Sequence, residues 1–154
     1  SNDPYLENSD SLWILHTYLS QNLNKATLYS LFFNEFFIFN FSKEALLDKT
    51  KRWCENNNIK ISANTLESDV SVLIKMYLKS NTRKEFSNGL FCELNLLHKV
   101  NNEYVFNIKN PAELSDSAFF YIFLYFIRDY KETTISVKDL QIGNTTSLRQ
   151  TLAL

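Results

Sequence analysis

Polar side chains of the kinds that read DNA gather on one predicted helix, and others lie in the link before it and at the tip of a predicted hairpin further along the chain. The helix spans residues 62–79, and its polar face carries amide, hydroxyl and ammonium groups. Asparagine can bind adenine through two hydrogen bonds and lysine neutralises phosphate, so these residue types suit a DNA-binding surface. The candidate DNA-binding residues are Lys60, Asn64, Thr65, Ser68, Lys75, Lys99, Asn101 and Asn102.

Two features of the same helix oppose a DNA-binding role. Glu67 and Asp69 lie in its first turns, where they would repel phosphate, and the helix has no arginine, which makes the commonest specific base contact. Taken alone, these residues therefore favour an ordinary solvated helix face. The whole chain has a net charge of −1 and a pI near 6.1, so a DNA-binding surface must be a local patch.

No other residues follow a pattern typical of catalysis or metal binding. His16 and His98 are the only histidines, and neither has cysteine, histidine or acidic partners at ligand spacing. We expect His16 at the edge of the core and His98 exposed. Glu44 and Asp48 share a helix face, but the lysines beside them favour surface ion pairs. We therefore expect no catalytic residue, no metal site and no cofactor.

Helical spacing and turn residues predict the elements that position the candidates. Ser62 or Asn64 caps the helix at 62–79, and Ser42 caps a supporting helix that ends near Asn56. Apolar runs at 93–97 and 104–107 flank asparagines, which tolerate left-handed turns, so they predict a β-hairpin. A short strand at 59–61 is an option. The predicted apolar face of the helix at 62–79 comprises Leu66, Val70, Leu73, Ile74 and Tyr77.

Aromatic runs supply the rest of the predicted core. Helices are expected from Asp10 or Ser11 to about residue 22, with Leu12, Leu15 and Leu19 on one face, and over 27–39. A long aromatic helix, capped by Ser115 or Asp116, should run to about residue 130 as a buried core element. A helix pair is expected over 136–154. The most apolar window, 118–127, is too short to cross a bilayer. The dense aromatic runs are core or a packing interface, and Cys54 and Cys92 should be buried, reduced thiols.

Several sequence blocks resemble an uncharacterised bacterial family. Asp-Pro-Tyr-Leu-Glu at 3–7 and Leu-Trp-Ile-Leu-His at 12–16 are similar to its DPYLE…LWLLHW signature. Residues 65–77 resemble its TL-x-x-DV…Y block, and 93–106 its E-L-x-L-[LI]…Y-x-F hairpin. The family is catalogued as a domain of unknown function. Thr17 stands where its members often have Trp, and residues 142–154 depart from its P-G-x-x-F-x-L pattern.

The resemblance implies a DNA-handling accessory protein. Members of the family occur beside genes for DNA sulfur modification (phosphorothioation) and anti-phage defence, and they carry a further N-terminal helix-turn-helix-like region. Since that region is missing here, we expect a fragment of a longer protein. No motif of the chain allows a catalytic residue to be carried over from the family.

Together, these observations predict a mainly α, winged-helix-like domain with a small β-hairpin and accessory aromatic helices. The domain should span residues 3–110, with a helical extension over 111–154 packed on it. The predicted function is non-enzymatic DNA binding or docking within a cytoplasmic bacterial DNA-modification or defence complex. The predicted partners are DNA and other proteins of that complex, and a homodimer is a further option. We expect no contact with a membrane. The alternatives are a protein-interaction module with the winged helix as scaffold and, more weakly, part of a DNA-nicking endonuclease.

Overall fold

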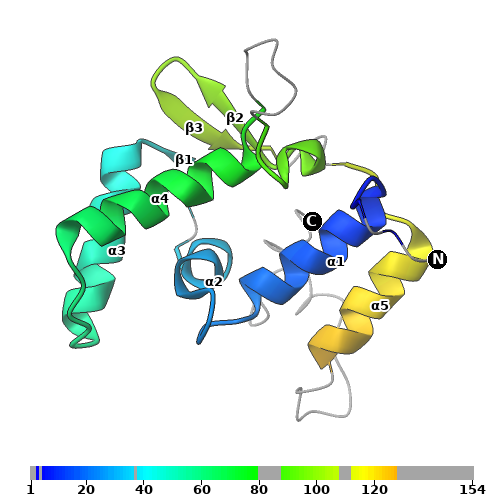
Figure 1. The fold of residues 1–154 in the computed structure, drawn as a ribbon, viewed down its shortest axis with the longest axis horizontal. Helices are drawn as coiled ribbons and strands as arrows, with labels where there is room; N and C mark the ends of the chain where they lie inside the picture. The colour runs from blue at the N-terminus through cyan, green and yellow to red at the C-terminus, as the bar shows by residue number, and fades with distance from the viewer. Residues whose placement is uncertain (1–2, 4, 37, 80–87, 108–111, 128–154) are drawn as a thin grey trace. The chain divides into compact units, whose positions relative to one another are not determined.

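The computed structural model describes residues 3, 5–36, 38–79, 88–107 and 112–127 of the chain. Those residues form five α-helices, one short 3-10 helix and three β-strands, as Figure 1 shows. The helices are α1 (Ser9–Ser20), α2 (Thr27–Asn34), α3 (Lys43–Asn56), α4 (Ala63–Tyr77), η2 (Cys92–Leu94) and α5 (Asp116–Ile127). The strands are β1 (Asn40–Phe41), β2 (Leu97–Val100) and β3 (Glu103–Phe106). The predicted mainly helical class with a small sheet is confirmed.

The chain divides into two compact units, which we describe separately. Unit 1 is drawn from residues 1–37 and 111–154 and contains α1, α2 and α5. Unit 2 is drawn from residues 38–110 and contains the three strands, α3, α4 and η2. That residues 3–110 act as one domain with residues 111–154 as an extension stays a prediction.

Two capped helices pack together in unit 2. The Ser42 hydroxyl accepts a hydrogen bond from the Ala45 N–H at 3.1 Å, and α3 begins there. The Ser62 hydroxyl accepts from the Thr65 N–H, also at 3.1 Å, at the start of α4. Each serine thus satisfies one backbone N–H that the first turn of a helix leaves unpaired. Ser42 is confirmed as a cap, and of the two caps considered for α4 the structure selects Ser62.

The end of α3 is closed by a left-handed asparagine. Asn58 has φ 56°, and its N–H donates to the carbonyl of Glu55. The N–H of Ile59 reaches back to the carbonyl of Cys54 at 2.8 Å, which completes a Schellman motif. Asparagine tolerates this backbone better than most residues. Of the two options for residues 59–61, a plain link or a short strand, the structure shows the link: these residues lie in the loop between α3 and α4 and form no strand.

The buried face of α4 is the centre of the unit 2 core. All of its predicted members are buried: Leu66, Val70, Leu73, Ile74 and Tyr77. Phe91 stacks on Tyr77 with ring centroids 5.1 Å apart, and its N–H donates to the carbonyl of Met76. The chain after α4 therefore packs back onto the last turn of that helix. The predicted strand at 93–97 is largely wrong, because Cys92–Leu94 form η2 and Asn95 turns left-handed at φ 55°.

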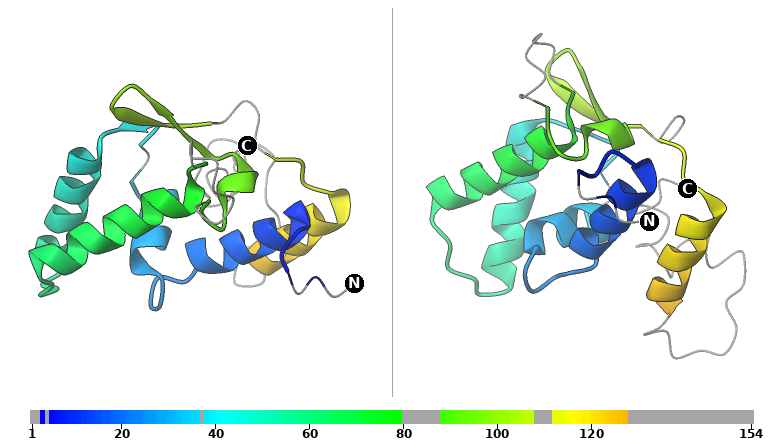
Figure 2. Two further views of the ribbon diagram at one scale, coloured as in Figure 1. Left: turned by 45° about the horizontal axis from the view of Figure 1, so that its top comes forward. Right: turned by 45° about the vertical axis from the view of Figure 1, so that its right-hand side comes forward.

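A three-stranded antiparallel sheet completes unit 2, in the order β1-β3-β2. The β2–β3 ribbon pairs Val100 with Glu103 around a turn in which Asn101 has φ 56°, which confirms the hairpin. The sequence did not predict β1, whose Phe41 pairs with Tyr104. The resulting order of strand, helix, helix and ribbon is winged-helix-like, and Figure 2 shows the ribbon from two further directions.

In unit 1, α1 buries a different face from the predicted one. Its cap is Asn8, whose side chain accepts from the Asp10 N–H at 2.9 Å, so neither Asp10 nor Ser11 is the cap. His16 is wholly buried, with its ring edge-on to Phe33 at 4.6 Å. The predicted face of Leu12, Leu15 and Leu19 is correct only for Leu12, and the buried residues are Leu12, Trp13, His16, Thr17 and Ser20. The next helix, α2, ends at residue 34, well before residue 39.

Ser115 caps α5 by accepting from the Ala118 N–H at 3.2 Å. The expected burial of this aromatic helix is wrong for one face, because Phe120, Tyr121 and Leu124 are exposed. Its predicted end near residue 130 and the helix pair over 136–154 lie outside the described residues. Within the part of the chain that the structure describes, no helix is long and apolar enough to cross a membrane.

Candidate nucleic-acid interface

The exposed side of α4 carries an unbroken polar stripe. Asn64, Ser68, Ser71 and Lys75 follow one another at intervals of three or four residues, so they lie on one helix face opposite the core. Asn64, Ser68 and Lys75 are exposed, and Ser71 is half-buried. A helix of 15 residues is about 22 Å long, so the stripe offers an amide and hydroxyls at one end and an ammonium group at the other.

Thr65 lies beside this stripe with a different role. Its hydroxyl is 2.7 Å from that of Ser62, so the two side chains form a single capping group at the start of α4. Both residues are exposed. The structure therefore gives Thr65 a part in capping the start of α4 as well as a place on its surface.

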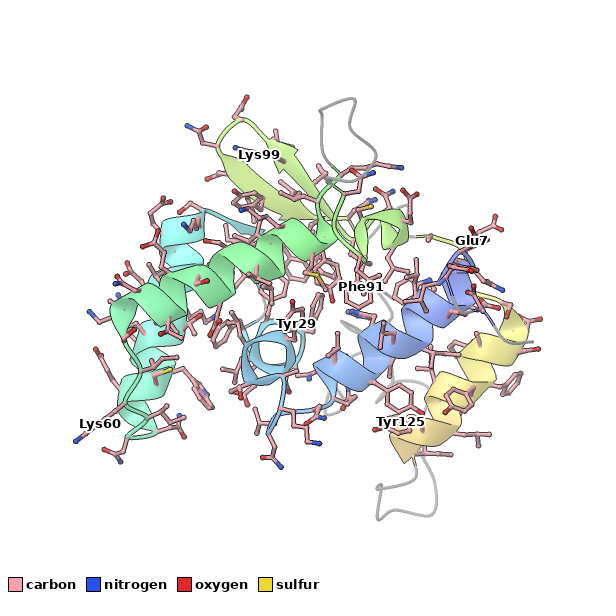
Figure 3. All side chains as sticks on the ribbon, viewed as in Figure 1. Glu7, Tyr29, Lys60, Phe91, Lys99 and Tyr125 are labelled. Carbon is pink, nitrogen blue, oxygen red and sulfur yellow. The ribbon has the colours of Figure 1, made fainter. Side chains whose placement is uncertain are left out.

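The remaining candidates form two separate groups. Figure 3 shows Lys60 and Lys99 at opposite ends of unit 2, the first in the loop before α4 and the second on the ribbon. Both are exposed, and the Lys99 ammonium lies 5.8 Å from the centre of the Tyr104 ring. Asn101 and Asn102 form the exposed tip of the ribbon. The structure thus brings together the residues of α4 and leaves Lys60 and the ribbon tip as outlying groups.

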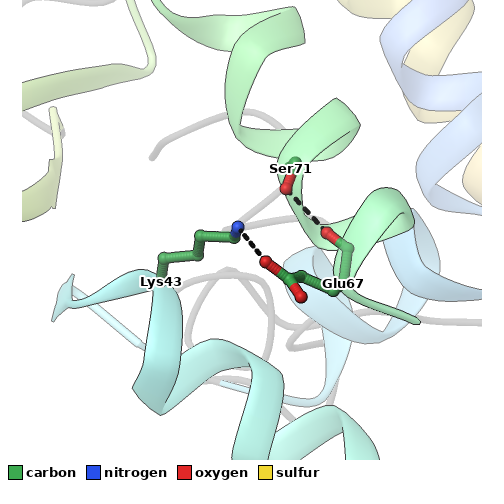
Figure 4. Close-up of polar contacts among 3 residues, drawn as sticks. All are labelled: Lys43, Glu67 and Ser71. Atoms are coloured by element: carbon green, nitrogen blue, oxygen red, sulfur yellow. Dashed lines mark hydrogen bonds and ion pairs between the residues drawn. The ribbon is translucent and has the colours of Figure 1, made fainter. Parts of the chain in front are cut away.

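One ion pair at the border of the α4 stripe was not predicted from the sequence. The Lys43 ammonium of α3 lies 2.9 Å from the Glu67 carboxylate of α4 (Figure 4). The side chains of the two residues are 33% and 58% exposed. Since 24 positions separate them in sequence, no local pattern could have predicted the contact. Asp69, the other acid that opposes phosphate, is also exposed.

An open groove lies at the C-terminal end of α4. Its volume is about 580 Å³, and Lys75 and Lys79 both line it, together with Val72 and Met76. Lys79 forms an ion pair with Glu93 at 3.2 Å. Lys75 and Lys79 thus place two ammonium groups along this groove, and the Glu93 carboxylate offsets one of them.

The two thiols are unsuited to nucleophilic chemistry. Cys54 and Cys92 are free and buried, as predicted. Burial raises the pKa of both thiols, and the neighbouring carboxylates of Glu55 and Glu93 raise it further. Over the described ranges of the chain, no three His, Cys, Asp or Glu side chains gather into a possible metal site.

One comparison with known proteins gives a match. A family model described as Protein of unknown function (DUF4007) matches residues 1–151. The chain belongs to this family. No curated protein and no solved structure matches it. The resemblance to an uncharacterised domain-of-unknown-function family is thereby confirmed, whereas its association with DNA sulfur modification and defence stays a prediction.

The opening block of this DUF4007 chain has a structural role. The Asp3 carboxylate accepts hydrogen bonds from the N–H groups of Glu7 at 3.2 Å and Asn8 at 3.0 Å. These bonds, chiefly that from Asn8, lower the pKa of Asp3. Leu6, inside the loop, has a left-handed backbone with φ 54°. Asp3, Leu6 and Glu7 of the opening block therefore take part in the turn that precedes α1.

Proposed function

We propose that this chain is a non-enzymatic DNA-binding or docking component of a cytoplasmic bacterial DNA-modification or defence system. The observation that carries the proposal is the stripe on α4. Asn64, Ser68 and Lys75 share one exposed helix face, in a unit with the order strand, helix, helix and ribbon. In this order the second helix is the one suited to enter a major groove.

The residue types divide naturally into base contacts and phosphate contacts. The Asn64 amide can donate to and accept from one base edge, and the Ser68 hydroxyl can do either. Lys75 can neutralise a phosphate, and Lys60 and Lys99 extend phosphate contacts beyond the two ends of α4. With one net negative charge on the chain, such binding depends on this local patch rather than on an overall field.

A second candidate function is protein docking through α5. Phe120, Tyr121 and Leu124 are 61%, 46% and 59% exposed on one helix of unit 1. Exposed apolar patches on a folded domain often mark partner surfaces. In this alternative the winged-helix-like unit serves as a scaffold, and a protein of the same complex covers the aromatic face.

Fluorescence-anisotropy titration with a labelled duplex, at low and moderate salt, tests the first function against the second. DNA binding through lysine–phosphate contacts predicts affinity that falls steeply as salt rises. A docking module predicts no such binding and, instead, association with a partner protein that is lost on Phe120→Ser. A purified chain that nicks plasmid DNA with a divalent ion would instead support the endonuclease alternative.

A further inference from the structure

The ion pair between Lys43 and Glu67 borders the proposed DNA-binding stripe. Glu67 follows Asn64 by three residues and precedes Ser71 by four, so its side chain neighbours both on the surface of α4. The Ser71 hydroxyl donates to the Glu67 backbone carbonyl at 2.6 Å (Figure 4), which leaves the carboxylate to Lys43. An acid at this position opposes a phosphate that approaches the stripe.

Lys43 lies at the positive end of its own helix, where an ammonium group is best stabilised by a nearby anion such as phosphate. Lys43 is the first residue of α3, where the helix dipole disfavours a positive charge. The same dipole favours an anion at that end. A phosphate near Lys43 would therefore meet the ammonium group close to the positive end of α3, where the Glu44 carboxylate also lies.

The contact that holds Lys43 can open at little cost. Both side chains are partly exposed, and exposed ion pairs contribute little to stability because water and salt screen them. A DNA phosphate carries a full negative charge and can compete with Glu67 for the ammonium group. Binding would then exchange one ion pair for another.

We propose that Lys43 is a further phosphate-binding residue and that Glu67, by pairing with it in the free protein, limits the affinity for DNA. This inference rests on the proposed function. Glu67 thus acts as an internal competitor of the DNA backbone at the junction of α3 and α4.

The test compares Glu67→Gln with Asp69→Asn. Each substitution removes one carboxylate from the exposed surface of α4, but of these two acids only Glu67 forms an ion pair with a lysine in the described part of the chain. Anisotropy titrations with one duplex over a range of salt give the slope of log K against log salt. A new phosphate contact steepens this slope by about one. We expect that change, with tighter binding, for Glu67→Gln and a smaller, charge-only gain for Asp69→Asn.

A double variant identifies the lysine responsible. In the Glu67→Gln background, Lys43→Met should return the slope to the wild-type value, and circular dichroism should show that every variant is folded. Equal slopes for Glu67→Gln and Asp69→Asn, or a slope in the double variant as steep as in Glu67→Gln, would overturn the inference. If the proposed DNA binding itself is wrong, the wild-type chain shows no salt-dependent binding. That result differs from either outcome that overturns the role of Lys43 and Glu67.

Discussion

The carboxylate of Asp10 on α1 accepts two hydrogen bonds from Ser115, the residue that caps α5. One comes from the Ser115 N–H at 3.0 Å and the other from its hydroxyl at 2.6 Å. The two residues are 105 positions apart in sequence. Nearby, the indole N–H of Trp13 donates to the carbonyl of Ala112 at 3.3 Å. The start of the chain is thus tied directly to the start of α5 within unit 1.

Loss of this tie should destabilise unit 1. Asp10→Ala removes both acceptors and leaves the Ser115 cap without its support, and we expect a loss of about 1–2 kcal/mol in the free energy of unfolding. Asp10→Asn keeps one acceptor oxygen and should fall between Asp10→Ala and the wild type. Urea unfolding monitored by tryptophan fluorescence measures all three proteins. Equal unfolding midpoints for Asp10→Ala and the wild type would contradict the role of the tie.

Gly89 should tolerate no side chain. A Cβ at this position would lie 2.0 Å from the carbonyl oxygen of Lys75 and 2.5 Å from the carbonyl carbon of Met76. Since both atoms belong to the backbone of α4, Gly89→Ala must push the segment around residue 89 away from that helix. We expect a cost of about 1–3 kcal/mol. Leu90→Ala, at a neighbouring position that is 41% exposed, should cost less when both are measured by thermal unfolding.

The buried thiols predict a pH dependence of stability. Burial raises the pKa of Cys54 and Cys92 above the ordinary value of 9.0, so both stay protonated in the folded protein at a pH where they ionise in the unfolded chain. Their contribution to stability is therefore complete below pH 9 and is lost as pH rises through the folded pKa. Urea midpoints should fall at alkaline pH, and this fall should be smaller in Cys54→Ala/Cys92→Ala.

The same burial predicts slow modification of the thiols. A thiol reagent at pH 8 should react with Cys54 and Cys92 far more slowly in the folded protein than in urea, because reaction requires an exposed thiolate. Equal rates in the two conditions would show that the thiols are accessible. The absorbance of the released chromophore measures both rates directly.

The sequence predicts α4 well because two independent signals agree there. The serine cap at Ser62 and the helical spacing from Leu66 to Tyr77 both indicate the same element. The exposed polar residues of α4 then follow as the opposite face of one helix. This is why Asn64, Ser68 and Lys75 could be found as neighbours without a structure.

Contacts between distant segments could not be predicted in this way. β1 has two residues and no periodicity, and it exists as a strand because it pairs with β3. The run at 93–97 has the composition of a strand, but packing of Phe91 on Tyr77 and the left-handed Asn95 favour a 3-10 turn. The pair of Lys43 and Glu67 likewise depends on how α3 meets α4.

Buried polar residues account for the error in α1. Thr17 donates to the carbonyl of Trp13 at 2.9 Å, and Ser20 donates to that of Thr17 at 3.1 Å. These bonds within the helix satisfy the hydroxyls, so they can be buried at low cost. A pattern of apolar residues alone therefore selects the wrong face. In α5 the opposite occurs, because apolar residues surround the helix but only one side is covered.

Charge reversal on α4 tests the central claim most directly. Lys75→Glu replaces the ammonium group of the stripe with a carboxylate, and Lys25→Glu makes the same change at an exposed position of unit 1. The measurement is anisotropy of a labelled duplex over a range of salt. We predict that Lys75→Glu weakens binding and lowers the salt slope by about one, whereas Lys25→Glu binds almost as the wild type does. Equal binding by Lys75→Glu and Lys25→Glu, or no binding by the wild type, would contradict the assignment of α4 as the DNA-binding surface.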